Sequence, residues 1–267
     1  MMKYTALIAG LALLSLSAAQ AEDWYPSKYG KDDTLGAINN LSPEKVLQAA
    51  KLIKTGKTYA LGVDTGPDTP AFPPRSFSMT ILQPDDGEGT PLGVNKTTYN
   101  DDLLFTWIGI GSQIDGLGHL GINHQYYNGV RNKDFAAPTG LTKFSIHELP
   151  PIVTRGVMLD MAGHMGKEIL PEGTAFNSAE IKAVAKKQGV SIGKGDVVLF
   201  HTGWQQIASK DPARFMAGQP GLGLEGSKYL ASLDVVAIGS DTFAMEVLPS
   251  EDASLAFPVH QELLAKN

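Results

Sequence analysis

The hydrophobic pattern of the chain switches between two periods. Segments with apolar residues at every third or fourth position predict helices, and short apolar runs bounded by glycines predict buried strands. The clearest helices follow Ser42-Pro43 and Asn177, where a capping residue precedes the apolar stripe. The predicted strands are Thr58–Val63, Ile152–Met161, Val197–Phe200 and Val235–Ile238. Because helices and strands alternate, the pattern predicts an α/β fold rather than an all-α or all-β one.

The ends of both helices are marked. Gly56 is expected to end the first helix, and Gly189 the second. Asn177 is followed three residues later by Glu180, which is the spacing of a capping box. Residues 64–100 contain six prolines and predict a long irregular stretch. Such a stretch often borders a binding site, and a plain surface excursion is the equal alternative.

The composition suits one large soluble domain. The chain has 267 residues, of which 43% are hydrophobic and 19% charged, so we expect residues 22–267 to form a single domain with a sizeable core. The net charge is −6 and no basic run is present, which argues against nucleic acid as a partner. The absence of cysteine excludes disulfides, thiolate metal ligands and a cysteine nucleophile.

The N-terminus has the layout of a signal peptide. Lys3 supplies a positive start, Ala6–Leu16 is a short apolar run, and Ala19-Gln20-Ala21 fits a cleavage site. The apolar run is too short to span a membrane. We therefore expect residues 1–21 to be removed on export to the periplasm, leaving a mature chain from Glu22 that is not held by a membrane.

Gly111–His119 concentrates more candidate chemistry than any other stretch. Gln113 and Asp115 are two positions apart, so in an extended segment their side chains leave the same face. Two glycines then permit a sharp turn that would bring His119 back toward that pair. An amide oxygen, a carboxylate and an imidazole suit a divalent cation. The spacing alone favours a plainer interpretation, a loop in which Gln113 and Asp115 bond to the backbone.

The same stretch resembles the signature His-x-Gly-Thr-His-x-Asp-x-x-x-His of the cyclase family, which includes the kynurenine-formamidase-like metal-dependent hydrolases. Its Thr, second His, Asp and final His align with Ser112, Gln113, Asp115 and His119. Gly109 stands where the first His belongs. Further segments are similar, in the same order, to longer family members: Lys31–Gly36, Leu41–Glu44, Gly195–Trp204 and Gly239–Pro249.

The resemblance implies a swivelling β/β/α-type α/β fold, a homo-oligomer and a metal centre. It implies that Gln113, Asp115, His119 and His260 hold a divalent ion, Mn²⁺ or Zn²⁺. Because an amide oxygen is a weaker ligand than imidazole, the replacement at Gln113 favours one harder ion such as Mn²⁺. The family's further ligand Glu would lie about a dozen residues after His260, beyond the last residue printed, so we expect a truncated C-terminus.

These features predict a hydrolase that acts on a small amide, lactam or lactone, similar to arylformamidases and isatin hydrolases. His119 and Asp115 are the predicted catalytic residues, which handle the protons of an activated water. Tyr126, Tyr127 and Trp204 are predicted to hold a planar substrate. The alternative is a non-catalytic periplasmic protein that binds a small molecule on the same fold, because two imidazoles of the signature are missing.

Three other side chains follow predicted strands. His201 ends one strand, and a place at the edge of a pocket is one interpretation for it. Asp241 and Glu246 follow another strand, at the sheet edge where sites are built in α/β folds. Turn and cap duty is the interpretation that we favour for both carboxylates.

Overall fold

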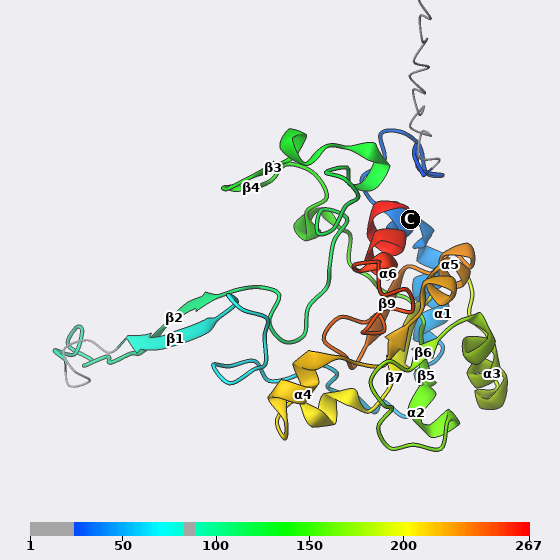
Figure 1. Ribbon diagram of the computed structural model, residues 1–267. Helices are drawn as coiled ribbons and strands as arrows, with labels where there is room; N and C mark the ends of the chain where they lie inside the picture. Colours follow the sequence, from blue (N-terminus) through cyan, green and yellow to red (C-terminus); the bar gives the residue numbers. More distant parts are fainter. Residues whose placement is uncertain (1–23, 83–88) are drawn as a thin grey trace, which may run out of the picture.

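A three-stranded parallel sheet in the order β5-β7-β9 contributes to the main hydrophobic core of the fold. Its strands are Gly156–Asp160, Val197–His201 and Ala237–Ser240. The computed structural model describes residues 24–82 and 89–267, so the predicted signal peptide, residues 1–21, lies outside the described part. Helices α3 (Ser178–Gln188) and α5 (Leu224–Ser232) pack on each other beside this sheet (Figure 1). The predicted α/β class is therefore confirmed.

The sequence of the central strand β7 is continuously apolar, but burial alternates along it: one face enters the core, and the other is only partly covered. Val198 and Phe200 are fully buried, and they join a core that includes Ile181 and Val184 of α3. The start of α3 has the predicted capping box: the carboxylate of Glu180 accepts a hydrogen bond of 2.8 Å from the backbone N–H at the cap. Local sequence signals thus place both elements correctly.

The remaining regular elements are mostly short. The helices are α1 (Pro43–Ala50), α2 (Met161–His164), α3 (Ser178–Gln188), α4 (Pro212–Ala217), α5 (Leu224–Ser232) and α6 (Pro258–His260), which continues as one π turn (Gln261–Ala265). The other strands are β1 (Phe77–Leu82), β2 (Asp101–Thr106), β3 (Ala136–Ala137), β4 (Gly140–Leu141), β6 (Ala175–Phe176) and β8 (Gly221–Leu222). Among the helices of the described ranges, none is both long and apolar enough to cross a bilayer.

Several predicted boundaries are wrong. Residues Thr58–Val63 form no strand, and Tyr59 and Leu61 are exposed, because no described strand pairs with this segment. The first helix ends at Ala50 rather than near Gly56. The predicted strand Val235–Ile238 begins two residues later and extends to Ser240, and β5 occupies only the second half of its predicted range. Pairing with neighbouring strands, rather than apolar composition, sets these limits.

The proline-rich stretch contains a strand that its sequence did not suggest. β1 pairs with β2 as an antiparallel ribbon, which projects from the rest of the chain (Figure 1). Almost every residue of both strands is exposed, including Met79, Leu103, Leu104 and Phe105. An isolated two-stranded ribbon is marginal in water, so this one is expected to need a cover that a single copy does not supply.

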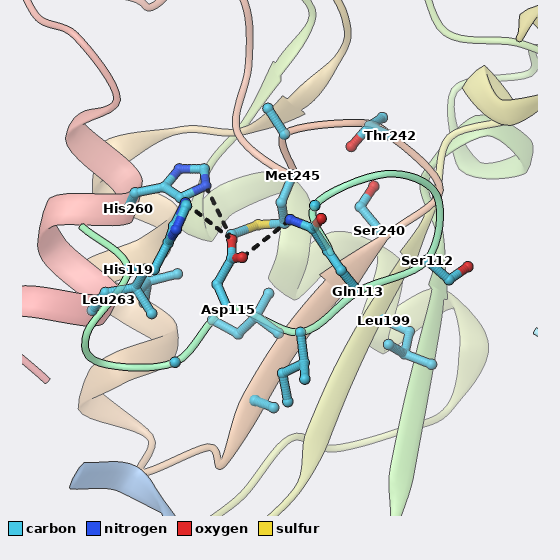
Figure 2. A pocket seen from close by; sticks show the side chains of 18 of the residues that line it. Ser112, Gln113, Asp115, His119, Leu199, Ser240, Thr242, Met245, His260 and Leu263 are labelled. Carbon is cyan, nitrogen blue, oxygen red and sulfur yellow. Dashed lines mark hydrogen bonds and ion pairs between the residues drawn. The ribbon is translucent and has the colours of Figure 1, made fainter. Parts of the chain in front are cut away.

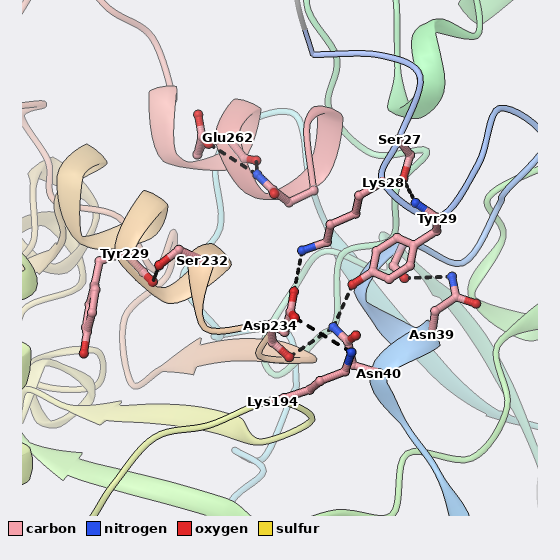
Figure 3. A network of polar contacts seen from close by, with 12 residues as sticks. Ser27, Lys28, Tyr29, Asn39, Asn40, Lys194, Tyr229, Ser232, Asp234 and Glu262 are labelled. Carbon is pink, nitrogen blue, oxygen red and sulfur yellow. Dashed lines mark hydrogen bonds and ion pairs between the residues drawn. The ribbon is translucent and has the colours of Figure 1, made fainter.

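The opening segment is attached to the end of the sheet by polar contacts (Figure 3). The amide of Asn40 donates to the hydroxyl of Tyr29 at 2.7 Å and to the carbonyl of Asp234 at 3.0 Å. Lys28 forms an ion pair of 2.5 Å with the Asp234 carboxylate. These contacts hold residues before α1 beside the strand β9, and so close one side of the cavity described next.

Candidate active site

The glycine-rich loop, Gly111–His119, brings the side chains of Gln113, Asp115 and His119 close together. The amide nitrogen of Gln113 donates to Oδ1 of Asp115 at 3.1 Å, as expected for two side chains on one face of an extended segment. The backbone N–H of His119 then bonds to the carbonyl of Gly116 at 2.9 Å, which closes a tight turn. As a result, Nε2 of His119 lies 3.9 Å from Oδ2 of Asp115 (Figure 2).

A fourth side chain reaches the same carboxylate from the end of the chain. His260, on α6, places its Nε2 atom 3.8 Å from Oδ2 of Asp115. Its other ring nitrogen, Nδ1, forms a short hydrogen bond with Oε1 of Glu246. The Glu246 carboxylate also accepts the backbone N–H groups of Val259 and His260, so it fixes both the helix start and the ring. Asp115 therefore lies between two imidazoles.

The site residues on the helix α6 and behind it are more deeply buried than those on the glycine-rich loop. The side chain of His119 is 42% exposed and that of His260 is 11% exposed, whereas Glu246 is almost completely buried. Gln113, Asp115, His119 and His260 line a cavity of about 870 Å³, whereas Glu246 is not part of its lining. This volume is in the range of small-molecule sites. The imidazole of His119 is therefore accessible from the cavity, while that of His260 is held in place by Glu246.

The donor chemistry of this cluster fits a divalent cation. One carboxylate and two imidazoles are common ligands of Zn²⁺ and Mn²⁺, and a carboxylate behind His260 is the usual support for a metal-bound imidazole. The two imidazoles, however, lie farther apart than two ligands of one ion would. The two rings have centroids 6.3 Å apart, whereas two imidazoles on one tetrahedral ion lie about 5 Å apart. Accordingly, no three His, Asp or Glu side chains of residues 24–82 and 89–267 form a closed metal-binding set as they stand.

Gln113 departs from its predicted role. Its amide nitrogen, not its oxygen, faces Asp115. The oxygen lies on the side of Gly109, where a Cβ atom would be only 3.0 Å from it. In this arrangement Gln113 orients the Asp115 carboxylate and does not present a donor oxygen toward the two histidines.

The three aromatic residues predicted to hold a substrate do not line the cavity. Tyr127 is fully buried, and its hydroxyl donates to Asp33 at 2.7 Å. Trp204 is also fully buried and donates to the carbonyl of Phe215. Tyr126 packs edge-on against Phe135. Packing took Tyr127 and Trp204 into the interior and left Tyr126 partly buried, and the aromatic part of the cavity wall includes instead Phe72, Phe243 and Phe257.

Asp241 and Asp160 make hydrogen bonds of their own and are not part of the Asp115 cluster. Asp241 has the turn duty that we favoured, because its oxygens accept the N–H groups of Thr202 and Gly203. His201 lines the cavity and contacts Asp160 at 2.9 Å. The hydrogen bond from His201 and then that from Gly163 hold the pKa of Asp160 below its ordinary value. Neither Asp160 nor Asp241 contacts Asp115 directly.

Two residues of the site were not recognised as functional from sequence. Glu246 was interpreted as a turn residue, and only its separation from His260 by one short connection hinted at a contact. Arg75 was not singled out at all, yet its guanidinium lines the cavity and donates to the carbonyl of Gly109 at 2.8 Å. It lies in the proline-rich stretch, residues 64–100, for which a place beside the binding site and a plain surface excursion were equal alternatives.

Comparisons with known proteins agree with this picture. The chain is similar to a crystal structure of a novel cyclase, with 28% identity over 91% of this chain and 82% of that one and a TM-score of 0.81. It shares its fold with isatin hydrolase A from Ralstonia solanacearum, at 20% identity over 78% and 74% of the chains and a TM-score of 0.57. An isatin hydrolase bound to the product analogue thioisatinate gives 21% identity over 85% and 84% and a TM-score of 0.57.

No curated protein gave a significant match. The family model described as putative cyclase matches residues 59–247, which include the glycine-rich loop, the parallel sheet and Glu246. With most of its length matched in this way, the chain belongs to the putative cyclase family.

Proposed function

We propose that this protein is a metal-dependent hydrolase that cleaves a small amide, lactam or lactone. The observation that carries the proposal is the position of Asp115 between His119 and His260, in a cavity of small-molecule size. The fold shared with isatin hydrolases supports the reaction class. Asp115 and His260 would hold the ion, either Mn²⁺ or Zn²⁺, and His119 would stand beside it with its ring nitrogens unbound, so that it can carry protons.

A divalent cation bound there would make a water acidic near neutral pH and polarise a carbonyl group. The residues of the chain do the rest. His119, the more exposed imidazole, accepts a proton from the attacking water and passes it to the leaving nitrogen or oxygen, while the bond between that atom and the carbonyl carbon breaks. Glu246 keeps His260 in one orientation, and Gln113 does the same for Asp115.

The cavity wall supports a planar substrate. Phe72 and Phe243 meet edge to face, with centroids 5.1 Å apart, and both line the cavity. An aromatic amide placed against them would bury its ring and leave its carbonyl group for the polar cluster. Arylformamides and cyclic aryl amides such as isatin are therefore the substrates to test first.

The second candidate is a protein of the same fold that binds a small molecule without catalysis. A specific observation favours it: Gly109 and Gln113 supply no imidazole, and the remaining donors form no closed set among the described residues. Metal content separates the two proposals. The hydrolase should be purified with close to one Mn or Zn per chain and should lose amidase activity on chelation and regain it on metal addition.

A metal-free protein that still binds a small aryl ligand would instead support the binding function. Activity that survives complete removal of metal would contradict the metal-dependent hydrolase. Both measurements need elemental analysis of the same preparation that is assayed, because an active minority could otherwise be mistaken for the whole.

Two further proposals concern the setting of the protein. We propose that residues 1–21 direct export to the periplasm; N-terminal sequencing of the mature protein should find Glu22 first. We also propose a homo-oligomer in which a second copy covers the β1–β2 ribbon. The exposed apolar residues of the ribbon, such as Leu103 and Phe105, support this proposal.

A further inference from the structure

We propose that Arg75 forms a carboxylate-binding subsite in the cavity, so that the ligands of this protein carry an anionic group. The inference rests on the cavity to which we assign the hydrolase function and names the class of its substrate. It is carried by four observations: the free donors of Arg75, the lack of an acidic partner for it among the described residues, the space made by Gly109, and two unpartnered hydroxyl groups in the wall of the same cavity.

Most of the hydrogen-bonding capacity of Arg75 is unused. A guanidinium has five N–H donors in a planar fork. Arg75 directs Nη1 to the carbonyl of Gly109, and within residues 24–82 and 89–267 its side chain makes no other hydrogen bond and no ion pair. The side chain is half-buried in the cavity wall. A ligand with two acceptor oxygens would satisfy the remaining donors.

The other charged residues of the cavity wall are already occupied. Lys28 is paired with Asp234 at 2.5 Å. Asp241 accepts three hydrogen bonds from Thr202 and Gly203. In the described part of the wall, Arg75 is thus the cation without an acidic partner. An anionic ligand placed there would gain a paired charge and would disrupt no existing ion pair.

The glycine at position 109 makes room for this guanidinium. A Cβ atom on Gly109 would lie 2.9 Å from Nη1 of Arg75, which is closer than real Cβ contacts, and 3.0 Å from Oε1 of Gln113, which is tighter than most of them, so the ends of both side chains would have to shift. Position 109 is where the family signature carries an imidazole. In this chain the space beside it holds a permanently charged guanidinium, so the departure at Gly109 and the presence of Arg75 are one structural feature.

Two hydroxyl groups of the same cavity have no hydrogen-bond partner. Ser240 ends β9 and Thr242 follows it, and the hydroxyl oxygen of each is buried and unpaired. Figure 2 shows both on the Gln113 side of Asp115, away from the two histidines. Buried polar groups are rarely left unpaired, so a polar ligand at this side of the cavity would supply what the chain does not.

The test uses benzoate and its neutral, non-hydrolysable isostere acetophenone as probes, with the full-length protein as purified and binding followed by calorimetry. Their ring suits the Phe72–Phe243 pair. We expect benzoate to bind at least tenfold more tightly than acetophenone. R75Q should weaken benzoate at least tenfold and change acetophenone less than twofold. R131Q, which alters an exposed arginine outside the cavity, is the matched control and should change neither.

G109A provides a second variant that leaves Arg75 in the sequence. Its added Cβ should displace the guanidinium and weaken benzoate several-fold, without a loss of secondary structure by circular dichroism. Equal benzoate affinity in the wild type and R75Q, or equal losses for both probes, would overturn the inference. Because binding is measured without turnover, a protein that hydrolyses no amide could still pass this test. An active amidase that binds benzoate equally well with and without the Arg75 side chain would contradict the inference but not the proposed function.

Discussion

Nε2 of His260 lies 3.8 Å from Oδ2 of Asp115, although one residue belongs to the last helix and the other to the glycine-rich loop. The contact depends on Glu246, which holds the other side of the imidazole ring and the start of the helix. Asp115 is therefore the meeting point of two remote segments, and each of the first two predictions removes one part of this arrangement.

Replacement of Asp115 by asparagine should abolish turnover while the fold persists. The amide keeps the shape of the carboxylate but loses its charge and one acceptor, so it can neither hold a cation as well nor accept a proton. We expect kcat/KM to fall at least a hundredfold and the melting temperature to change by only a few degrees. The matched control is Asp134→Asn at an exposed position. Unchanged activity in Asp115→Asn would refute the catalytic assignment.

Replacement of Glu246 by glutamine should lower the metal affinity of the site, although Glu246 itself would not contact the metal. Glu246 is a positioning residue, and loss of such a carboxylate behind a metal-bound imidazole typically costs 10–100-fold in metal affinity. Competition with a calibrated chelator measures this affinity, and a changed pH–rate profile would separate the effect from simple destabilisation. Glu148→Gln, at an exposed position, serves as the control. A folded Glu246→Gln protein with wild-type metal affinity would contradict the assignment.

The β1–β2 ribbon should mediate association between copies. Phe105 is 72% exposed in a single copy, so an aspartate there would place a charge in any interface that covers the ribbon. We expect Phe105→Asp to weaken self-association at least tenfold in sedimentation velocity experiments. Val190→Asp changes an exposed apolar residue that follows α3 and should have little effect. A wild-type protein that is monomeric at all concentrations would exclude the proposed oligomer.

Stability should depend on pH through Asp33. Burial raises the pKa of Asp33, but hydrogen bonds from Tyr127 and Asn39 outweigh it and hold the pKa below the ordinary 3.8. A lowered carboxyl pKa contributes stability that is present above 3.8 and is lost as the pH falls through the folded value. Asp33→Asn should therefore cost about 1–2 kcal/mol at pH 7 and less near pH 3.

Urea unfolding at the two pH values measures this difference. Asp32→Asn, at the exposed neighbouring position, should show no such dependence. A cost for Asp33→Asn that is the same at pH 7 and pH 3 would mean that the charge of Asp33 plays no part in docking the opening segment.

Local signals were sufficient for the elements with clear ends. The capping box at Asn177 and the buried run of β7 depend on neighbours in sequence, and both formed as predicted. The segment Thr58–Val63 has a similar strand-like composition and formed no strand. A strand exists only when another strand pairs with it, and pairing is not written in the six residues themselves.

The contacts of the site also fall into those that follow from local sequence and those that depend on tertiary structure. By itself the sequence predicted that Gln113 and Asp115 would leave the same face, because they are two positions apart, and that a glycine turn could bring His119 back toward them; both contacts form within a few residues of chain. Only the tertiary structure decided that Glu246 would orient His260, that Arg75 would fill the space beside Gly109, and that Trp204 would be buried away from the cavity. Those contacts join segments far apart in the chain, so they depend on how the sheet and its connections pack.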